Sequence, residues 1–177
     1  VFYHRTELPD PNKGFSSNTS FIYYNDSASK IGSFSVQNRQ SITYDEMPQN
    51  LRDAVVSAEN RTFWSDPGIS VKGMSRAAFS VLRGGDVQGG STITQQYIKV
   101  LYLSQERTMQ RKLKELVLAD KMGRKVPKED ILAGYLNTIY FGRGAYGVQA
   151  AARAYFNIDA KDLDLRQAAV LAAVLNN

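Results

Sequence analysis

Residues 84–99 read GGDVQGGSTITQQYIK, in which glycines, small hydroxyl side chains and amides precede a lysine. Thr92 and Gln95 have the spacing of a capping box, which predicts that a helix begins here. Backbone amides at a helix start lack intrahelical partners and attract phosphate, and the glycine pair 89–90 would let a ligand approach them closely. Lys99 adds a positive charge. The stretch therefore fits an anion cradle, and a glycine-rich loop with an ordinary helix cap explains it equally well.

A second group of charged residues lies in the segment 104–125, SQERTMQRKLKELVLADKMGRK. At roughly 100° per residue, one side of this helix would carry Met109, Leu113, Leu116, Val117 and Asp120. The opposite side would carry Arg107, Arg111, Lys114 and Glu115. Three cations and one carboxylate on one face could hold a diphosphate or a phosphate with its metal. A solvated face with internal ion pairs is the commoner arrangement for such a helix taken alone.

The third candidate is a carboxylate, Glu59 in the stretch AVVSAENRTFW. It follows Val55 by four residues and lies at the edge of an apolar helical stripe, close to Phe63 and Trp64. We expect partial desolvation there, which raises the pKa of a carboxylate and makes it a better base near neutral pH. A glutamate at a helix end, paired with Arg61 or with solvent, is the simpler interpretation of the same residues.

The fourth candidate, FGRGAYG at residues 141–147, contains the letters of a dinucleotide fingerprint. That motif requires a strand before its first glycine. Here the residues 131–140 carry apolar side chains at helical spacing instead. The sequence therefore predicts a tight corner between two helices, with Arg143 exposed.

The elements that must position these residues are mostly helical. Residues 1–18 read as a linker, and about 19–37 form two short strand patterns around a polar turn, which predicts a β-hairpin. Helical patterns then follow near 51–58, 71–82, from Thr92, and near 104–122, 128–140, 146–156 and 164–175. The last begins with Asp164-x-x-Gln167, again at capping-box spacing. Strands and helices do not alternate, so the predicted fold class is mainly α, in one domain of 177 residues.

Composition restricts the possible chemistry. The net charge is +5, which favours acidic partners such as phosphates, nucleic acid or an anionic membrane. The absence of cysteine excludes disulfides, thiolate metal sites and cysteine nucleophiles, and the single histidine, His4, does not favour a catalytic triad. No apolar run approaches the roughly 18 residues of a membrane span. Because the chain opens on Val1 and ends within a helical pattern, we expect it to be part of a longer protein.

Four stretches stand in a specific order: AENRTFWSDPG, GGSTITQQYIK, RKLKE and ILAGYLNTIYFGRGAYG. Together they resemble the peptidoglycan glycosyltransferase domain, family 51, of class A penicillin-binding proteins and monofunctional transglycosylases. The resemblance covers about residues 20–175, and the hairpin region looks more like that of the bifunctional proteins. It implies a lysozyme-like helical fold over residues 19–177, with a small membrane-facing jaw subdomain at about 69–90.

The resemblance also implies an activity, namely polymerisation of lipid II into glycan strands on the extracytoplasmic face of the bacterial membrane. Glu59 would deprotonate the GlcNAc 4-hydroxyl of the acceptor, which attacks the MurNAc anomeric carbon of the growing chain with inversion. Glu115 would be the second catalytic carboxylate, near the leaving diphosphate or a divalent metal, Mg²⁺ or Mn²⁺. The donor site would be lined by Ser91, Thr94, Gln95, Gln96, Lys99, Arg107, Arg111 and Lys114.

The partners implied by the resemblance are lipid II, the growing glycan strand, the membrane surface and phosphoglycolipid inhibitors, with no nucleic acid. A membrane anchor and a C-terminal transpeptidase domain would lie elsewhere in the parent chain. Residues 69–85 support membrane contact, since as a helix they place Val71, Met74 and Leu82 on one face and cations on a neighbouring arc. Burial of that helix in the domain core is the commoner alternative.

The chain departs from the family pattern at four positions. Asn60 stands where the family usually has Asp, and Asp66 where it usually has His. Ala133 and Gln167 stand where glutamates are usual. The two catalytic carboxylates themselves are present.

Two other functions account for part of these observations. A lysozyme-like glycoside hydrolase or lytic transglycosylase needs a general acid and a water or carboxylate nucleophile, but no phosphate cradle. A non-catalytic nucleic-acid or membrane-binding module explains the positive charge, but not Glu59 and Glu115. Clustering of positive charge within residues 99–128, rather than along an extended track with stacking aromatics, favours the transferase.

Overall fold

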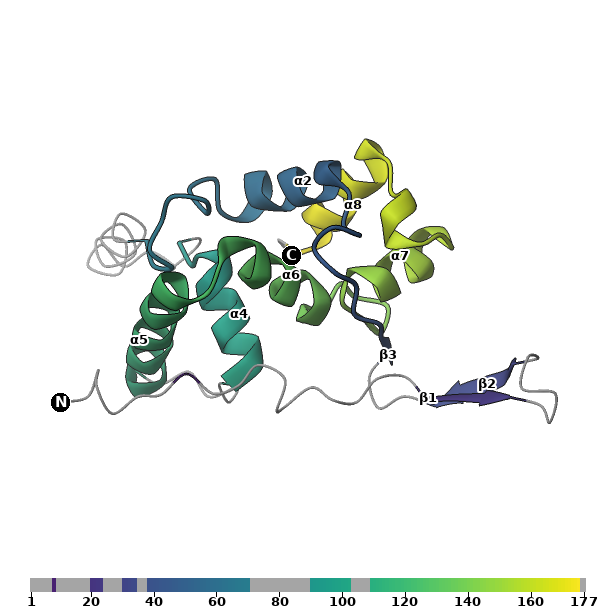
Figure 1. Ribbon diagram of the computed structural model, residues 1–177, viewed down its shortest axis with the longest axis horizontal. Helices are drawn as coiled ribbons and strands as arrows, with labels where there is room; N and C mark the ends of the chain where they lie inside the picture. The colour runs from purple at the N-terminus through teal and green to yellow at the C-terminus, as the bar shows by residue number, and fades with distance from the viewer. Residues whose placement is uncertain are drawn as a thin grey trace, which may run out of the picture.

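The computed structural model describes residues 8, 20–23, 30–34, 38–70, 90–102 and 109–175 (Figure 1). Its helices are α2 (Gln49–Glu59), α4 (Ile93–Tyr102), α5 (Met109–Lys125), α6 (Lys128–Thr138), α7 (Val148–Phe156), a 3-10 turn η2 (Ala160–Asp162) and α8 (Leu165–Leu175). The predicted mainly helical fold class is thus confirmed. The predicted helix at 71–82, most of the predicted jaw and Arg107 lie outside the described residues.

The helices form one core around α6. This helix contacts α4, α5 and α7, while α2 packs against α8 and α4 lies against α5 (Figure 1). Large side chains at the centre, including Leu51, Phe63, Leu132 and Phe141, are fully buried. No helix in the described ranges has both the length and the apolar character needed to span a bilayer.

Both capping boxes predicted from the sequence are formed. At the start of α4, the Thr92 amide donates to Gln95 Oε1 at 3.0 Å, and the Gln95 amide donates to Thr92 Oγ1 at 3.1 Å. At the start of α8, Asp164 and Gln167 exchange the same pair of bonds at 3.0 and 2.8 Å. Local sequence therefore fixes where these two helices begin.

The strands are short and lie at the edges of the helical core. β1 (Ser20–Tyr23) pairs antiparallel with β2 (Lys30–Phe34), within the range predicted for a hairpin. β3 (Asn38–Arg39) pairs in parallel with β4 (Ala145–Tyr146), a pairing that the sequence analysis did not anticipate. Because β4 occupies the corner, the helices predicted at 128–140 and 146–156 are each two residues shorter than expected.

The corner at residues 139–147 is a turn between α6 and α7, as predicted. A helix precedes its first glycine, so the segment lacks the strand that a dinucleotide fingerprint needs. Arg143 is exposed and adopts a left-handed φ of 52°. Its guanidinium lies 4.4 Å from the centre of the Tyr155 ring, a cation–π contact that stabilises the turn.

Candidate active site

Glu59 is the last residue of α2 and points toward α4. Its Oε2 accepts a hydrogen bond of 2.8 Å from the Gln96 side-chain amide, while Arg61 donates instead to the Ser57 carbonyl. The Glu59 side chain is partly buried, and its other oxygen, Oε1, is shielded from solvent with no hydrogen-bond partner within the described ranges. Of the simpler interpretation, pairing with Arg61 or with solvent, the pair with Arg61 is therefore not formed in the described structure. The carboxylate has one neutral donor and one oxygen without a partner.

Gln96 is itself held from the opposite side by α6. The hydroxyl of Tyr135, a fully buried residue, donates to Gln96 Oε1 at 2.9 Å. Burial, followed by the negative charge of Glu59, raises the pKa of Tyr135 above its ordinary value. This hydroxyl therefore stays protonated at neutral pH and serves as a donor.

The packing of α4 on α6 brings these groups together. Gly134 faces Tyr97 so closely that a Cβ on Gly134 would lie 2.2 Å from the Tyr97 hydroxyl oxygen. A larger residue there would require the Tyr97 side chain to move. The adjacent residues, Tyr135 after Gly134 and Gln96 before Tyr97, belong to the hydrogen-bonded set just described.

The loop after Glu59 is held against α5 and α6. Asp66 accepts hydrogen bonds from Asn60 Nδ2 at 2.8 Å and from Lys128 Nζ at 3.1 Å, and the Lys128 ammonium lies over the Phe63 ring. A Cβ on Gly68 would lie 2.2 Å from the Ala119 carbonyl oxygen, so the loop backbone rests directly on α5. These contacts fix the direction in which α2 ends, and hence the position of Glu59.

Glu115 lies on α5 in a different environment. Only 2% of its side chain is exposed, and Gln95 Nε2 donates to its Oε1 at 3.3 Å. Arg111 pairs with its Oε2 at 3.3 Å, and Lys112 contacts its Oε1 directly. Two cations and an amide thus satisfy both oxygens of this buried carboxylate.

The predicted division of α5 into two faces is wrong. The sequence analysis placed Glu115 opposite the apolar side, yet Glu115 is buried and Leu113, assigned to the apolar side, is 53% exposed. The buried stripe is Glu115, Leu118, Ala119 and Met122, spaced at i, i+3, i+4 and i+7. The physical reason is that Arg111 and Lys112 neutralise Glu115 and allow it to face the core.

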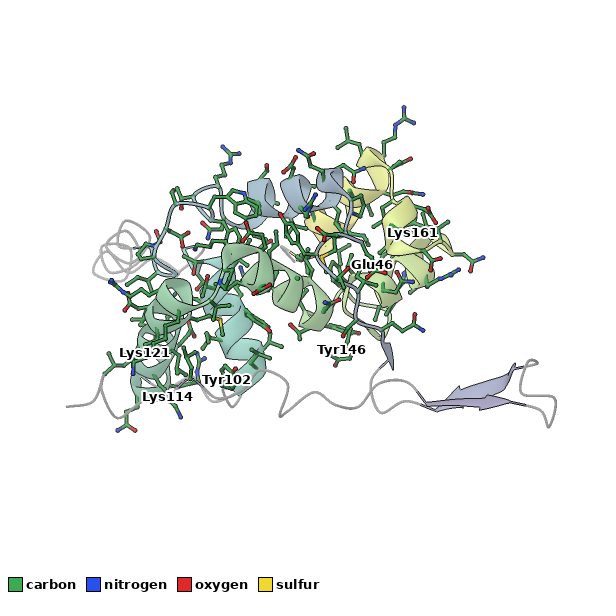
Figure 2. The ribbon with its side chains drawn as sticks, viewed as in Figure 1. Glu46, Tyr102, Lys114, Lys121, Tyr146 and Lys161 are labelled. Carbon is green, nitrogen blue, oxygen red and sulfur yellow. The ribbon has the colours of Figure 1, made fainter. Side chains whose placement is uncertain are left out.

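The other predicted site residues fall into three groups. Ser91, Lys99 and Lys114 are exposed, and Lys114 lies at the same end of the α4–α5 pair as Tyr102 (Figure 2). Thr94 is fully buried, and no partner for its hydroxyl lies within the part of the chain that the structure describes. The capping box uses the amides of Thr92 and Gln95 internally, so these two amides of the predicted anion cradle are already bonded.

The described residues do not fit a metal ion held by Glu115. Its two oxygens together already accept hydrogen bonds from three donors, two of which are cationic. Over the same described ranges, no cluster of three or more acidic or histidine side chains is placed to bind a cation. No step at Glu115 is therefore assigned to a metal.

Two residues of the site were not singled out from the sequence. Lys112 lies three residues before Glu115, a spacing that allows side chains to meet on a helix, and this signal was available. Tyr135 looked like one member of an apolar stripe. A buried tyrosine hydroxyl needs a partner, but only the fold shows that the partner is Gln96.

With this geometry in view, comparison with known proteins identifies the family. Residues 26–177 match the model of a family described as Transglycosylase, and the match includes both glutamates. The chain belongs to the transglycosylase family. Within this domain, Glu59 on α2 and Glu115 on α5 are each hydrogen-bonded to one of two consecutive glutamines of α4.

Several proteins are similar to this transglycosylase domain. Penicillin-binding protein 1A of Mycobacterium tuberculosis is 46% identical over 78% of the chain and 17% of its own length. Penicillin-binding protein 1F of Bacillus subtilis is 41% identical over 82% of the chain and 20% of its own length. Penicillin-binding protein 1A of Aquifex aeolicus is 42% identical over 94% of the chain and 23% of its own length. The chain thus spans about a fifth of these curated relatives.

Proposed function

We propose that this transglycosylase domain is an inverting peptidoglycan glycosyltransferase that polymerises lipid II. The observation that carries the proposal is the contrast between its two carboxylates. Glu59 contacts one neutral amide and keeps one oxygen without a donor in the described structure, whereas Glu115 is surrounded by cations. This transfer needs two components: a group that accepts a proton, and a positively charged site for the leaving anion.

In the proposed reaction, Glu59 takes the proton of the acceptor's GlcNAc 4-hydroxyl as its oxygen bonds to the anomeric carbon of the donor's MurNAc. The bond from that carbon to the lipid diphosphate breaks, and the electron pair leaves with the diphosphate. Attack from the face opposite the leaving group gives inversion. General-base catalysis of this type contributes roughly 10²–10⁴ in rate.

The leaving diphosphate gains negative charge as the bond breaks, so fixed cations near it lower the barrier. Arg111 and Lys112 are already held on α5 by Glu115. We propose that Glu115 acts through these cations, orienting them toward the diphosphate. Exposed Lys114 and Lys99 would add charge at the donor site together with Arg107, and the neutral side chains of Ser91, Thr94, Gln95 and Gln96 would line it.

The proposed surroundings follow from the substrate. Because the lipid of lipid II stays in the bilayer, the domain would work at the extracytoplasmic membrane surface, with residues 69–90 as its membrane-facing jaw. The similarity to penicillin-binding proteins supports a parent chain with a membrane anchor and a C-terminal transpeptidase domain. Phosphoglycolipids would inhibit by occupying the donor site.

The test is polymerisation by the purified full-length protein supplied with lipid II. We expect glycan strands and free lipid diphosphate, in amounts that match the linkages formed. Release of reducing ends from preformed glycan, with no polymer from lipid II, would establish the lytic activity and overturn the proposal. Parallel reactions with Mg²⁺, with Mn²⁺ and with a chelator measure whether a divalent metal takes part.

A further inference from the structure

The side-chain amide of Gln96 has a defined orientation. An ionised carboxylate only accepts hydrogen bonds, so the NH₂ group of Gln96 must face Glu59 Oε2, 2.8 Å away. Its carbonyl oxygen then faces the Tyr135 hydroxyl, 2.9 Å away, which acts as the donor. Each end of the amide therefore meets a partner of the correct kind, and a flipped amide would place its oxygen against the carboxylate.

Tyr135 is suited to hold this orientation. It is a fully buried residue of α6, and its neighbour Gly134 is in close contact with the Tyr97 side chain of α4. Burial and the charge of Glu59 raise the pKa of its hydroxyl, so the hydroxyl remains a donor over the physiological pH range.

The consequence is an asymmetric carboxylate at Glu59. Oε2 is bound by Gln96, whereas Oε1 is shielded from solvent and has no partner in the described part of the structure. A buried polar atom without a partner is destabilising, and such an atom in a native fold calls for an explanation. A donor that arrives only with the substrate, such as an acceptor hydroxyl, explains it.

We propose that Tyr135 and Gln96 form a hydrogen-bond relay that fixes the Glu59 side chain and selects its Oε1 as the oxygen that takes the acceptor's proton. Tyr135 and Gln96 are positioning residues, since they act through Glu59. The identity of the proton donor rests on the proposed function.

The relay predicts a particular pattern of kinetic losses in the full-length protein. Tyr135→Phe removes the hydroxyl and lets the Gln96 amide flip, so kcat for lipid II polymerisation should fall by roughly tenfold, as expected for about 1.4 kcal/mol, with KM changed less than twofold. Gln96→Leu should lower kcat at least as much. If Tyr135 acts through Gln96, the double variant should match Gln96→Leu alone.

Tyr155→Phe is the matched control. The Tyr155 hydroxyl donates to the Phe141 carbonyl at 2.7 Å, so its removal also deletes one tyrosine hydrogen bond, but at the α6–α7 corner. We expect a loss of melting temperature similar to that of Tyr135→Phe with kcat unchanged. Equal kcat in Tyr135→Phe and wild type, or additive losses in the double variant, would overturn the relay while leaving the proposed function intact.

Wild-type protein that makes no polymer would overturn the proposed function instead. The relay is then decided by thermal unfolding of the same full-length protein, using Tyr135→Phe, Glu59→Gln and their combination. Residues joined through one amide should show coupled stabilities, so the two losses in melting temperature should fail to add by about 1 °C or more. Additive losses would show that Tyr135 and Glu59 are independent.

Discussion

Glu59 and Glu115 are bonded to adjacent residues of the same helix, yet their surroundings are opposite. Gln96 and Gln95 project about 100° apart around α4, so one reaches α2 and the other reaches α5. Glu59 has a single neutral donor and is partly buried, whereas Glu115 is almost fully buried with two cations. Neighbouring glutamines thus bind one carboxylate whose described contacts include no cation and another that is paired with two.

The difference indicates what each position is built for. Two cations and an amide bind the oxygens of Glu115, which suits this carboxylate to hold Arg111 and Lys112 in place. At Glu59 no cation competes for the charge among the contacts that the structure describes. The proposed base and the proposed anchor of the cations are both glutamates, and they differ in the charge of the groups that contact them.

The largest expected effect is on catalysis at Glu59. Glu59→Gln keeps the size of the side chain and can still bond to Gln96, but it cannot accept a proton. Polymerisation of lipid II should fall by roughly 10²–10⁴, while melting temperature and lipid II binding change little. A variant that keeps more than a tenth of the wild-type rate would remove Glu59 from the role of base.

The next largest effect is on stability at Glu115. Glu115→Ala leaves Arg111, whose side chain is only 15% exposed, without its carboxylate, and it also leaves Gln95 Nε2 without its acceptor. We expect the free energy of unfolding to fall by about 1–3 kcal/mol. Solvent screens the contribution of Lys112 to this loss, because its side chain is 40% exposed. Thermal unfolding should show a drop of roughly 2–10 °C. An unchanged melting temperature would mean that the cations do not depend on Glu115.

A matched pair of lysines refines the comparison further. Lys112 contacts Glu115, whereas Lys114, two residues later, is exposed. Lys114→Gln should weaken binding of diphosphate donors and phosphoglycolipids by about two- to fivefold, the range for an exposed charge, with the melting temperature unchanged. Lys112→Gln should lower both the binding of these charged ligands and the melting temperature. Binding of an uncharged glycan should respond less, and equal losses for charged and uncharged ligands would show that the lysines serve stability alone.

The parts of this site that were predictable from sequence were the local ones. Capping residues such as Thr92 and Gln95 act within one turn, so their spacing identified the start of α4. The buried face of α5 was predicted wrongly because periodicity treats every glutamate as a polar, exposed residue. Glu115 is buried because Arg111 pairs with its carboxylate. The bond from Tyr135 to Gln96 joins residues 39 apart in sequence, so no local pattern could indicate it. The same holds for the bond between Lys128 and Asp66.

The smallest effect separates the role of burial from that of the donor set. Asp159 accepts from Gln149 Nε2 and from Arg153, both at 2.6 Å, so like Glu115 it has an amide and a guanidinium as donors, but it is partly exposed. The hydrogen bond from Gln149, and then the charge of Arg153, hold the pKa of Asp159 below its ordinary value near 3.8. A lowered folded-state pKa stabilises the protein above the unfolded-state pKa, and this stability is lost as the pH falls through the folded-state value. We expect Asp159→Asn to lower the melting temperature slightly at pH 7 and to make no difference once the pH is well below 3.8. Melting curves from pH 7 downward measure this, and a loss at pH 7 as large as that of Glu115→Ala would show that the donors, and not burial, set the strength of such a site.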